Sequence, residues 1–138
     1  MAVFLSNTGV ITLDSVVLSD HVTSVTLNHA FDELEITTLG DSSHRFTKGL
    51  EASTVTFSFL NDDAASGPGS VRKTLQNAWG TTVTLTLKQT ADAVSATNPL
   101  WSTTILVNNT TDINGAVGDM STQDITFTCN SVVTPTYS

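Results

Sequence analysis

The sequence is short of charged residues, and of basic residues above all. Only 13% of its 138 residues are charged, whereas soluble domains average about 25%. Five Lys and Arg residues stand against thirteen Asp and Glu, which gives a net charge of −8 at pH 7. A surface that binds phosphates needs clustered Lys and Arg, and Arg72 and Lys73 are the one adjacent pair. Specific nucleic-acid binding is therefore not expected, whereas electrostatic repulsion of nucleic acid is possible.

Cysteine and long apolar runs are also scarce. The single cysteine, Cys129, excludes an internal disulfide, and its place in an alternating pattern predicts a buried small side chain. No apolar run approaches the roughly 18 residues of a membrane helix. The N-terminus lacks a basic region followed by an apolar run, so no signal peptide is expected. We therefore expect a protein that is made in a cytoplasm and does not enter a membrane.

Patterns that carry catalysis or bind metal are missing as well. No G-x-S-x-G nucleophile elbow occurs, and residues 41–44 (DSSH) are better explained as a turn than as a catalytic group. His21 and His29 would lie about 26 Å apart in one extended strand, too far to share a metal ion. The acidic residues lack the spacing of a calcium loop. We therefore expect no enzymatic activity, no cofactor and no metal site.

Threonine is abundant where charge is rare, since it occurs 25 times. A surface of short hydroxyl groups costs little to desolvate, which suits burial against other subunits but also suits many secreted β-domains. The dominant pattern alternates apolar and hydroxyl-bearing residues, which is typical of half-buried strands. This alternation is clearest at residues 54–59, 82–87 and 124–129, and further strands are expected at 10–13, 22–27, 34–38 and 102–107.

Two features interrupt the alternation. The apolar positions change from odd to even between Phe31 and Leu34, so a bulge or turn is expected there. At about 71–79 the apolar residues follow the helical spacing i, i+4, i+7 and i+8. Ser70 stands where a helix begins and Gly80 where one ends, which supports a short helix.

These patterns predict a mainly β (α+β) fold in a single domain over residues 1–138. The expected architecture is an antiparallel β-sandwich or open barrel with one short flanking helix. The segment at 38–50 lies between two expected strands, is too long for a hairpin turn, and holds three of the few Arg, Lys and His residues. It is either a contact with another subunit or a surface loop that lies on its own subunit.

Residues 22–59, VTSVTLNHAFDELEITTLGDSSHRFTKGLEASTVTFSF, resemble the tail-tube proteins of long-tailed bacteriophages. The shared order is a strand, a T-x-x-G-D turn, a loop with Arg or Lys, a G-L pair and an alternating strand. The helix and the strand at 82–87 follow in the same order, and residues 113–127 (INGAVGDMSTQDITF) are similar to the family's Gly-containing turn and closing strand. The chain departs from the family at Leu39, where an aromatic residue is often found. The matching positions in the first stretch are Thr37, Gly40, Asp41, Arg45, Gly49, Leu50, Val55, Phe57 and Phe59.

The resemblance implies a structural subunit of a phage tail tube. Its copies would form stacked hexameric rings, whose strands join into a continuous barrel around a channel for DNA. Such a protein belongs to the virion and is assembled in the cytoplasm of the bacterial host. Its partners would be copies of itself, other phage tail proteins and DNA in transient, non-specific passage.

The resemblance also implies that the loop at 38–50 reaches neighbouring subunits or the next ring. Glycines would permit turns at both ends of this loop, and apolar and basic side chains would anchor it on an acidic partner. The expected contact residues are Gly40, Asp41, His44, Arg45, Phe46, Lys48, Gly49 and Leu50. Three acidic residues are candidates either for lining the channel, where they would repel DNA, or for an outer solvated face: Asp32, Glu33 and Glu35.

Two other functions stay open at this point. A capsid decoration or head–tail connector protein can share this compact β fold. A non-catalytic binding β-sandwich, for example one that binds carbohydrate, would present exposed aromatic side chains. Of the two tryptophans, Trp79 is expected on the apolar side of the helix, and Trp101 at the start of a strand.

Overall fold

The computed structural model describes residues 9–62 and 70–138. The N-terminal residues 1–8, where no signal peptide is expected, lie outside the described part. Over these residues the fold is mainly β, with antiparallel strand pairs and one short α-helix, as predicted. In chain order the elements are β1 (Val10–Leu13), β2 (Val16–Val17), the 3-10 helix η1 (Ser19–His21), β3 (Val22–Asn28), β4 (Phe31–Glu35), β5 (Phe46–Glu51), β6 (Thr54–Leu60), α1 (Val71–Ala78), β7 (Thr82–Lys88), β8 (Leu100–Leu106), β9 (Thr122–Thr128) and β10 (Thr134–Thr136).

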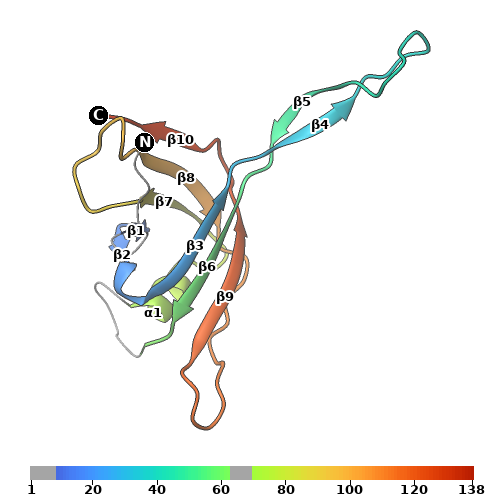
Figure 1. Ribbon diagram of the computed structural model, residues 1–138. Helices are drawn as coiled ribbons and strands as arrows, with labels where there is room; N and C mark the ends of the chain where they lie inside the picture. Colours follow the sequence, from blue (N-terminus) through green and yellow to red (C-terminus); the bar gives the residue numbers. More distant parts are fainter. Residues whose placement is uncertain (1–8, 63–69) are drawn as a thin grey trace.

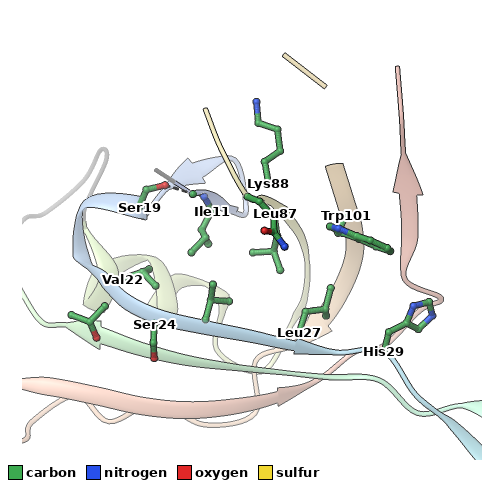
Figure 2. A pocket seen from close by; sticks show the side chains of 13 residues that line it. Ile11, Ser19, Val22, Ser24, Leu27, His29, Leu87, Lys88 and Trp101 are labelled. Carbon is green, nitrogen blue, oxygen red and sulfur yellow. Dashed lines mark hydrogen bonds between the residues drawn. The ribbon is translucent and has the colours of Figure 1, made fainter. Parts of the chain in front are cut away.

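Two sheets form the body of the molecule, which is a β-sandwich (Figure 1). One has the strand order β10-β8-β7-β1-β2 and the other the order β3-β6-β9. At one border Ile105 of β8 bridges to Cys129, just after β9, and joins the two sheets. On the side of β3 they separate around a cleft of about 720 Å³, lined by apolar side chains such as Leu27, Leu87 and Trp101 (Figure 2).

The core forms where the alternating patterns of the two sheets face each other. The apolar residues of β6 and β9 point inward, and three phenylalanines lie together: the ring centroid of Phe57 is 5.0 Å from Phe59 and 6.2 Å from Phe127. Helix α1 adds Val71 and Leu75, both fully buried. Burial of a large apolar side chain stabilises a fold by about 1.5–3 kcal/mol, so these residues hold the body together.

The third sheet is the hairpin of β4 and β5, which corrects the predicted loop at 38–50 and the predicted strand at 34–38. Strand β4 begins at Phe31 and ends at Glu35, and residues 46–51 form strand β5 opposite it. The register shifts between Phe31 and Glu33, so the predicted bulge is confirmed. The loop prediction failed in part because β5 shows no alternation of buried and exposed residues that would reveal a strand. The strand forms because its backbone pairs with β4.

Two side chains differ from their predicted environments. Trp79 is 62% exposed, because the backbone leaves helical geometry at this residue (φ −56°, ψ 128°) and the side chain no longer continues the apolar face. The expectation that Trp79 faces the core is therefore wrong. Gly80 has φ +78°, as expected of a glycine that ends a helix. Cys129 is half-buried rather than buried, and partial burial raises the pKa of its thiol.

Candidate functional site

The hairpin of β4 and β5 leaves the body as a long projection, here called the arm (residues 30–52; Figure 1). Every residue of β4 is exposed, and the arm exposes large apolar side chains, among them Leu39 (108%) and Leu50 (82%). All eight predicted contact residues lie in the arm. Soluble monomers rarely expose apolar side chains in clusters unless those clusters bind something. The arm is therefore the first candidate for a contact surface.

The tip of the arm is ordered by its own hydrogen bonds. Ile36 N–H donates to Arg45 O (2.9 Å) and extends the ladder beyond β4. The Asp41 carboxylate accepts the backbone N–H of Thr38 (2.8 Å) and its hydroxyl (3.1 Å). The hydrogen bond from the Thr38 N–H is the main reason why the pKa of Asp41 lies below its ordinary value of 3.8. Arg45 contacts Asp41 only at 3.4 Å, so its guanidinium keeps unused hydrogen-bonding capacity.

Gly40 has the predicted turn role, because it lies in the turn that the Asp41 N–H closes on Thr38 O (3.0 Å). Gly49 does not have that role. Gly49 lies inside β5, opposite the bulge in β4. A Cβ at Gly49 would lie 2.8 Å from the backbone oxygen of Asp32 and 3.3 Å from Cγ of Leu34, so glycine is required by close approach. A Cβ at Gly40 would meet nothing within 4 Å.

Glu51 ties the base of the arm to the body. One carboxylate oxygen accepts the backbone N–H of Val133 (2.8 Å), and the other lies 2.8 Å from Nε2 of His29. The hydrogen bond from the Val133 N–H is the main cause that lowers the pKa of Glu51. The His29 ring in turn meets Trp101 of β8 edge-on, at 6.4 Å between centroids. These contacts fix the direction in which the arm leaves the sandwich.

The outer surface of the sheet β3-β6-β9 is a second candidate, because it carries almost only hydroxyl and amide groups. Residues that face outward lie in rows across the three strands. Within these rows Ser58 Oγ donates to Asp124 Oδ1 (2.6 Å), and the hydroxyls of Thr56 and Thr126 lie 3.0 Å apart. Asp124 is the one charge of this hydroxyl face, whose members are Ser24, Thr26, Asn28, Thr54, Thr56, Ser58, Asp124, Thr126 and Thr128.

Strand β3 borders the hydroxyl face and is an edge strand. Ala52 N–H donates to Ala30 O, so by the alternation of antiparallel ladders the even residues of β3 bond to β6. The N–H and C=O groups of Val25 and Leu27 then point away from β6, toward the open edge. Natural edge strands are usually blunted by charge or proline, and β3 (VTSVTLN) contains neither. This edge can accept another strand.

A third surface lies at the end of the sandwich opposite the arm, here called the far end, where β3 and β9 begin and β6 ends (Figure 1). The turn before β9 exposes Ile113 (93%) and Val117 (106%). Beside it, Gln76, Trp79, Thr110 and Asp112 line a shallow hollow of about 250 Å³. No pattern in the sequence predicted this hollow, because the end of the helix and a distant loop come together only on folding.

The three acidic residues considered for a channel lie on β4, in the arm, and not on the hydroxyl face. Glu33 stands opposite Lys48 in the register, and a carboxylate oxygen of Glu35 lies 2.5 Å from Nδ1 of His44. Asp32 lies at the bulge, beside Gly49. Whether Asp32, Glu33 and Glu35 line a channel or an outer face is not tested by this arrangement, so the channel position stays a prediction.

Within residues 9–62 and 70–138, no group of three or more His, Cys, Asp or Glu side chains is arranged to hold a metal ion. Each histidine instead stands near one carboxylate, in the pairs His21–Asp62, His29–Glu51 and His44–Glu35. No helix of the described part is long and apolar enough to cross a bilayer.

No family model matches the sequence, and no curated protein sequence matches it either. Among solved structures, the chain is similar to a chain of the "Virion of native gene transfer agent (GTA) particle". The TM-score is 0.72, over 97% of this chain and 99% of that chain, at 9% sequence identity. An identity this low establishes a shared fold and nothing finer.

Proposed function

We propose that this chain is a structural subunit of a phage-like tail tube, without catalytic activity. Copies form rings, expected to be hexameric, and the rings stack into a tube that conducts DNA. In this proposal the protein resides in the tail of the virion and is assembled in the bacterial cytoplasm, where it contacts its own copies and other tail proteins. The observation that carries the proposal is the arm, which projects away from the body (Figure 1) and exposes large apolar side chains.

The shared fold supports the proposal, because the similar chain belongs to a virion particle and is matched over nearly its whole length. The order of motifs in residues 22–59 points to the tail-tube family independently of that comparison. The low content of charged residues also agrees with a protein whose sides are buried against sister copies, because exposed charge is costly to desolvate.

In the proposed ring the hydroxyl face lines the channel. A duplex that passes it meets short neutral groups and one acidic side chain per copy, Asp124, with no basic residue among the nine of this face. Binding of DNA depends on Lys and Arg that displace counterions, so this face offers no hold on the backbone. The six carboxylates of one hexameric ring would add repulsion.

The open edge of β3 closes the ring in this proposal by accepting a strand from the neighbouring copy. Main-chain hydrogen bonds then extend the sheet from one copy to the next. A Val25→Pro variant tests this step, because the Val25 N–H points to the open edge and has no hydrogen-bond partner among the described residues. The variant should fold as the natural chain does and form no rings, whereas the matched control Val25→Thr, which keeps the N–H, should form them.

Negative-stain microscopy of the purified chain tests the function itself. Rings or hollow tubes are expected, alone or on isolated tail tips that nucleate growth. A chain that stays monomeric at high concentration, even with tail tips present, contradicts the proposal. Copy number per particle separates a tube subunit from a connector or decoration protein, because tube subunits greatly outnumber connectors and decoration proteins sit on the shell.

A further inference from the structure

We propose that the hollow at the far end is the receptor for the arm tip of a second copy, and that Arg45 of that copy binds between Trp79 and Asp112. The inference rests on the proposed function, because it names the contact by which one ring holds the next. Its elements are the hollow, the free donors of Arg45 and the placement of both at opposite ends of the sandwich.

The hollow has the chemistry of a guanidinium site. Trp79 is 62% exposed, and Asp112 lines the same hollow of about 250 Å³ together with Gln76 and Thr110. One oxygen of Asp112 accepts the Thr110 hydroxyl (2.9 Å), and its other oxygen has no hydrogen-bond partner among the described residues. A planar cation can stack on the indole while it donates to the carboxylate.

Arg45 lies in the arm, at the end of the sandwich opposite the hollow. Its side chain is 57% exposed, and among the described residues it pairs with Asp41 alone, at 3.4 Å. Exposure to solvent weakens this ion pair further. Exposed Leu39 lies on the same tip and can bury its side chain when the tip docks. Guanidinium groups and anchoring apolar side chains are typical of the residues that dominate protein interfaces.

The register of the sheet places the two surfaces for head-to-tail contact. At one end of the sheet, Asn28 of β3 pairs with Thr54 of β6, and both strands continue there into the arm. At the opposite end, Leu60 of β6 pairs with Thr122 of β9, next to the turn of the far end. Copies stacked along the strand direction therefore bring the arm of one against the far end of the next. Such a contact is heterologous and continues without closing, as a tube requires.

Charge reversal tests the pair directly. Arg45→Glu and Asp112→Arg should each give folded rings that no longer stack, because each places like charges together. The double variant Arg45→Glu/Asp112→Arg restores an opposite pair and should recover tubes. Lys73→Glu is the control, since it reverses an exposed charge on α1 that lies outside the hollow, and it should stack normally. Single variants that stack as the natural chain does would overturn the proposal, as would a double variant that stays unstacked.

Cross-linking separates this inference from the proposed function. One copy carries Arg45→Cys and another carries Asp112→Cys, both with Cys129→Ser, and a short bismaleimide is added to the mixture. A covalent dimer that needs both cysteines is expected, and Lys73→Cys in place of Asp112→Cys should not give it. Tubes without this dimer refute the contact and leave the tube function standing. The dimer without rings or tubes supports the contact and refutes the tube.

Discussion

The body and the arm solve the problem of apolar surface in opposite ways. In the body, alternation places Phe57, Phe59 and Phe127 in one core with almost no exposure. In the arm, Phe46 and Leu50 are as apolar as those residues, but they stay exposed. The same side-chain chemistry therefore serves stability in one region and is left unused by the isolated copy in the other. We infer that the arm is completed by a partner.

The largest contrast is expected from one substitution made in both regions. Phe57→Ala should lower the free energy of unfolding by about 3–5 kcal/mol, because it opens a cavity in the core. Phe46→Ala should change that free energy by less than about 0.5 kcal/mol and impair tube formation instead. Urea unfolding followed by circular dichroism measures the first effect, and microscopy the second. Equal destabilisation by the two substitutions would end the distinction between body and arm.

A smaller effect is expected from the two glycines of the arm. In Gly49→Ala the new Cβ would lie 2.8 Å from Asp32 O, and the backbone distortion that relieves such a contact costs about 1 kcal/mol or more. Hydrogen exchange should show faster opening of β4 and β5 with the body unchanged. Gly40→Ala is the matched control, because its Cβ meets open space at ordinary φ. Protection of the arm that is equal in both variants would contradict the role of the bulge.

The smallest effect concerns acid and the arm tip. Because the Thr38 N–H lowers the pKa of Asp41 in the folded arm, the carboxylate stabilises the tip fully above its unfolded pKa. This contribution is lost as the pH falls through the lower folded pKa, below about 3.8. The amide proton of Thr38, followed by NMR, should titrate in that range, and Asp41→Asn should remove the step. A midpoint above the ordinary value would show that the bond does not form.

The sequence predicted the body well because burial leaves a periodic trace. The hydroxyl groups at even positions of residues 54–59 predicted an outer face and an inner core, and the structure has both. The phase change near Phe31 predicted the bulge that lies in β4, near the base of the arm. Both predictions follow from one physical rule, that neighbouring strand residues face opposite sides of a sheet.

The surfaces at the two ends could not be read in the same way. Strand β5 has no buried face along most of its length, so its residues show no period that could reveal it. Trp79 fits the helical period but leaves the helix at its last turn, and its neighbour Asp112 lies 33 positions later in the chain. Proximity of that kind is created by the tertiary fold, and a single sequence carries no local trace of it.

The open edge of β3 also has a consequence for the cell that makes the protein, because it limits how much unassembled protein the cell can hold. An open edge strand of seven residues without charge or proline is a template on which another extended chain can pair, including a second copy of this protein. If the chain builds the proposed tube, unassembled copies would aggregate through this edge, so synthesis of the protein has to keep pace with growth of the tube. In the proposed tube, the edge that closes each ring around the channel is thus also the edge that makes surplus protein prone to aggregate.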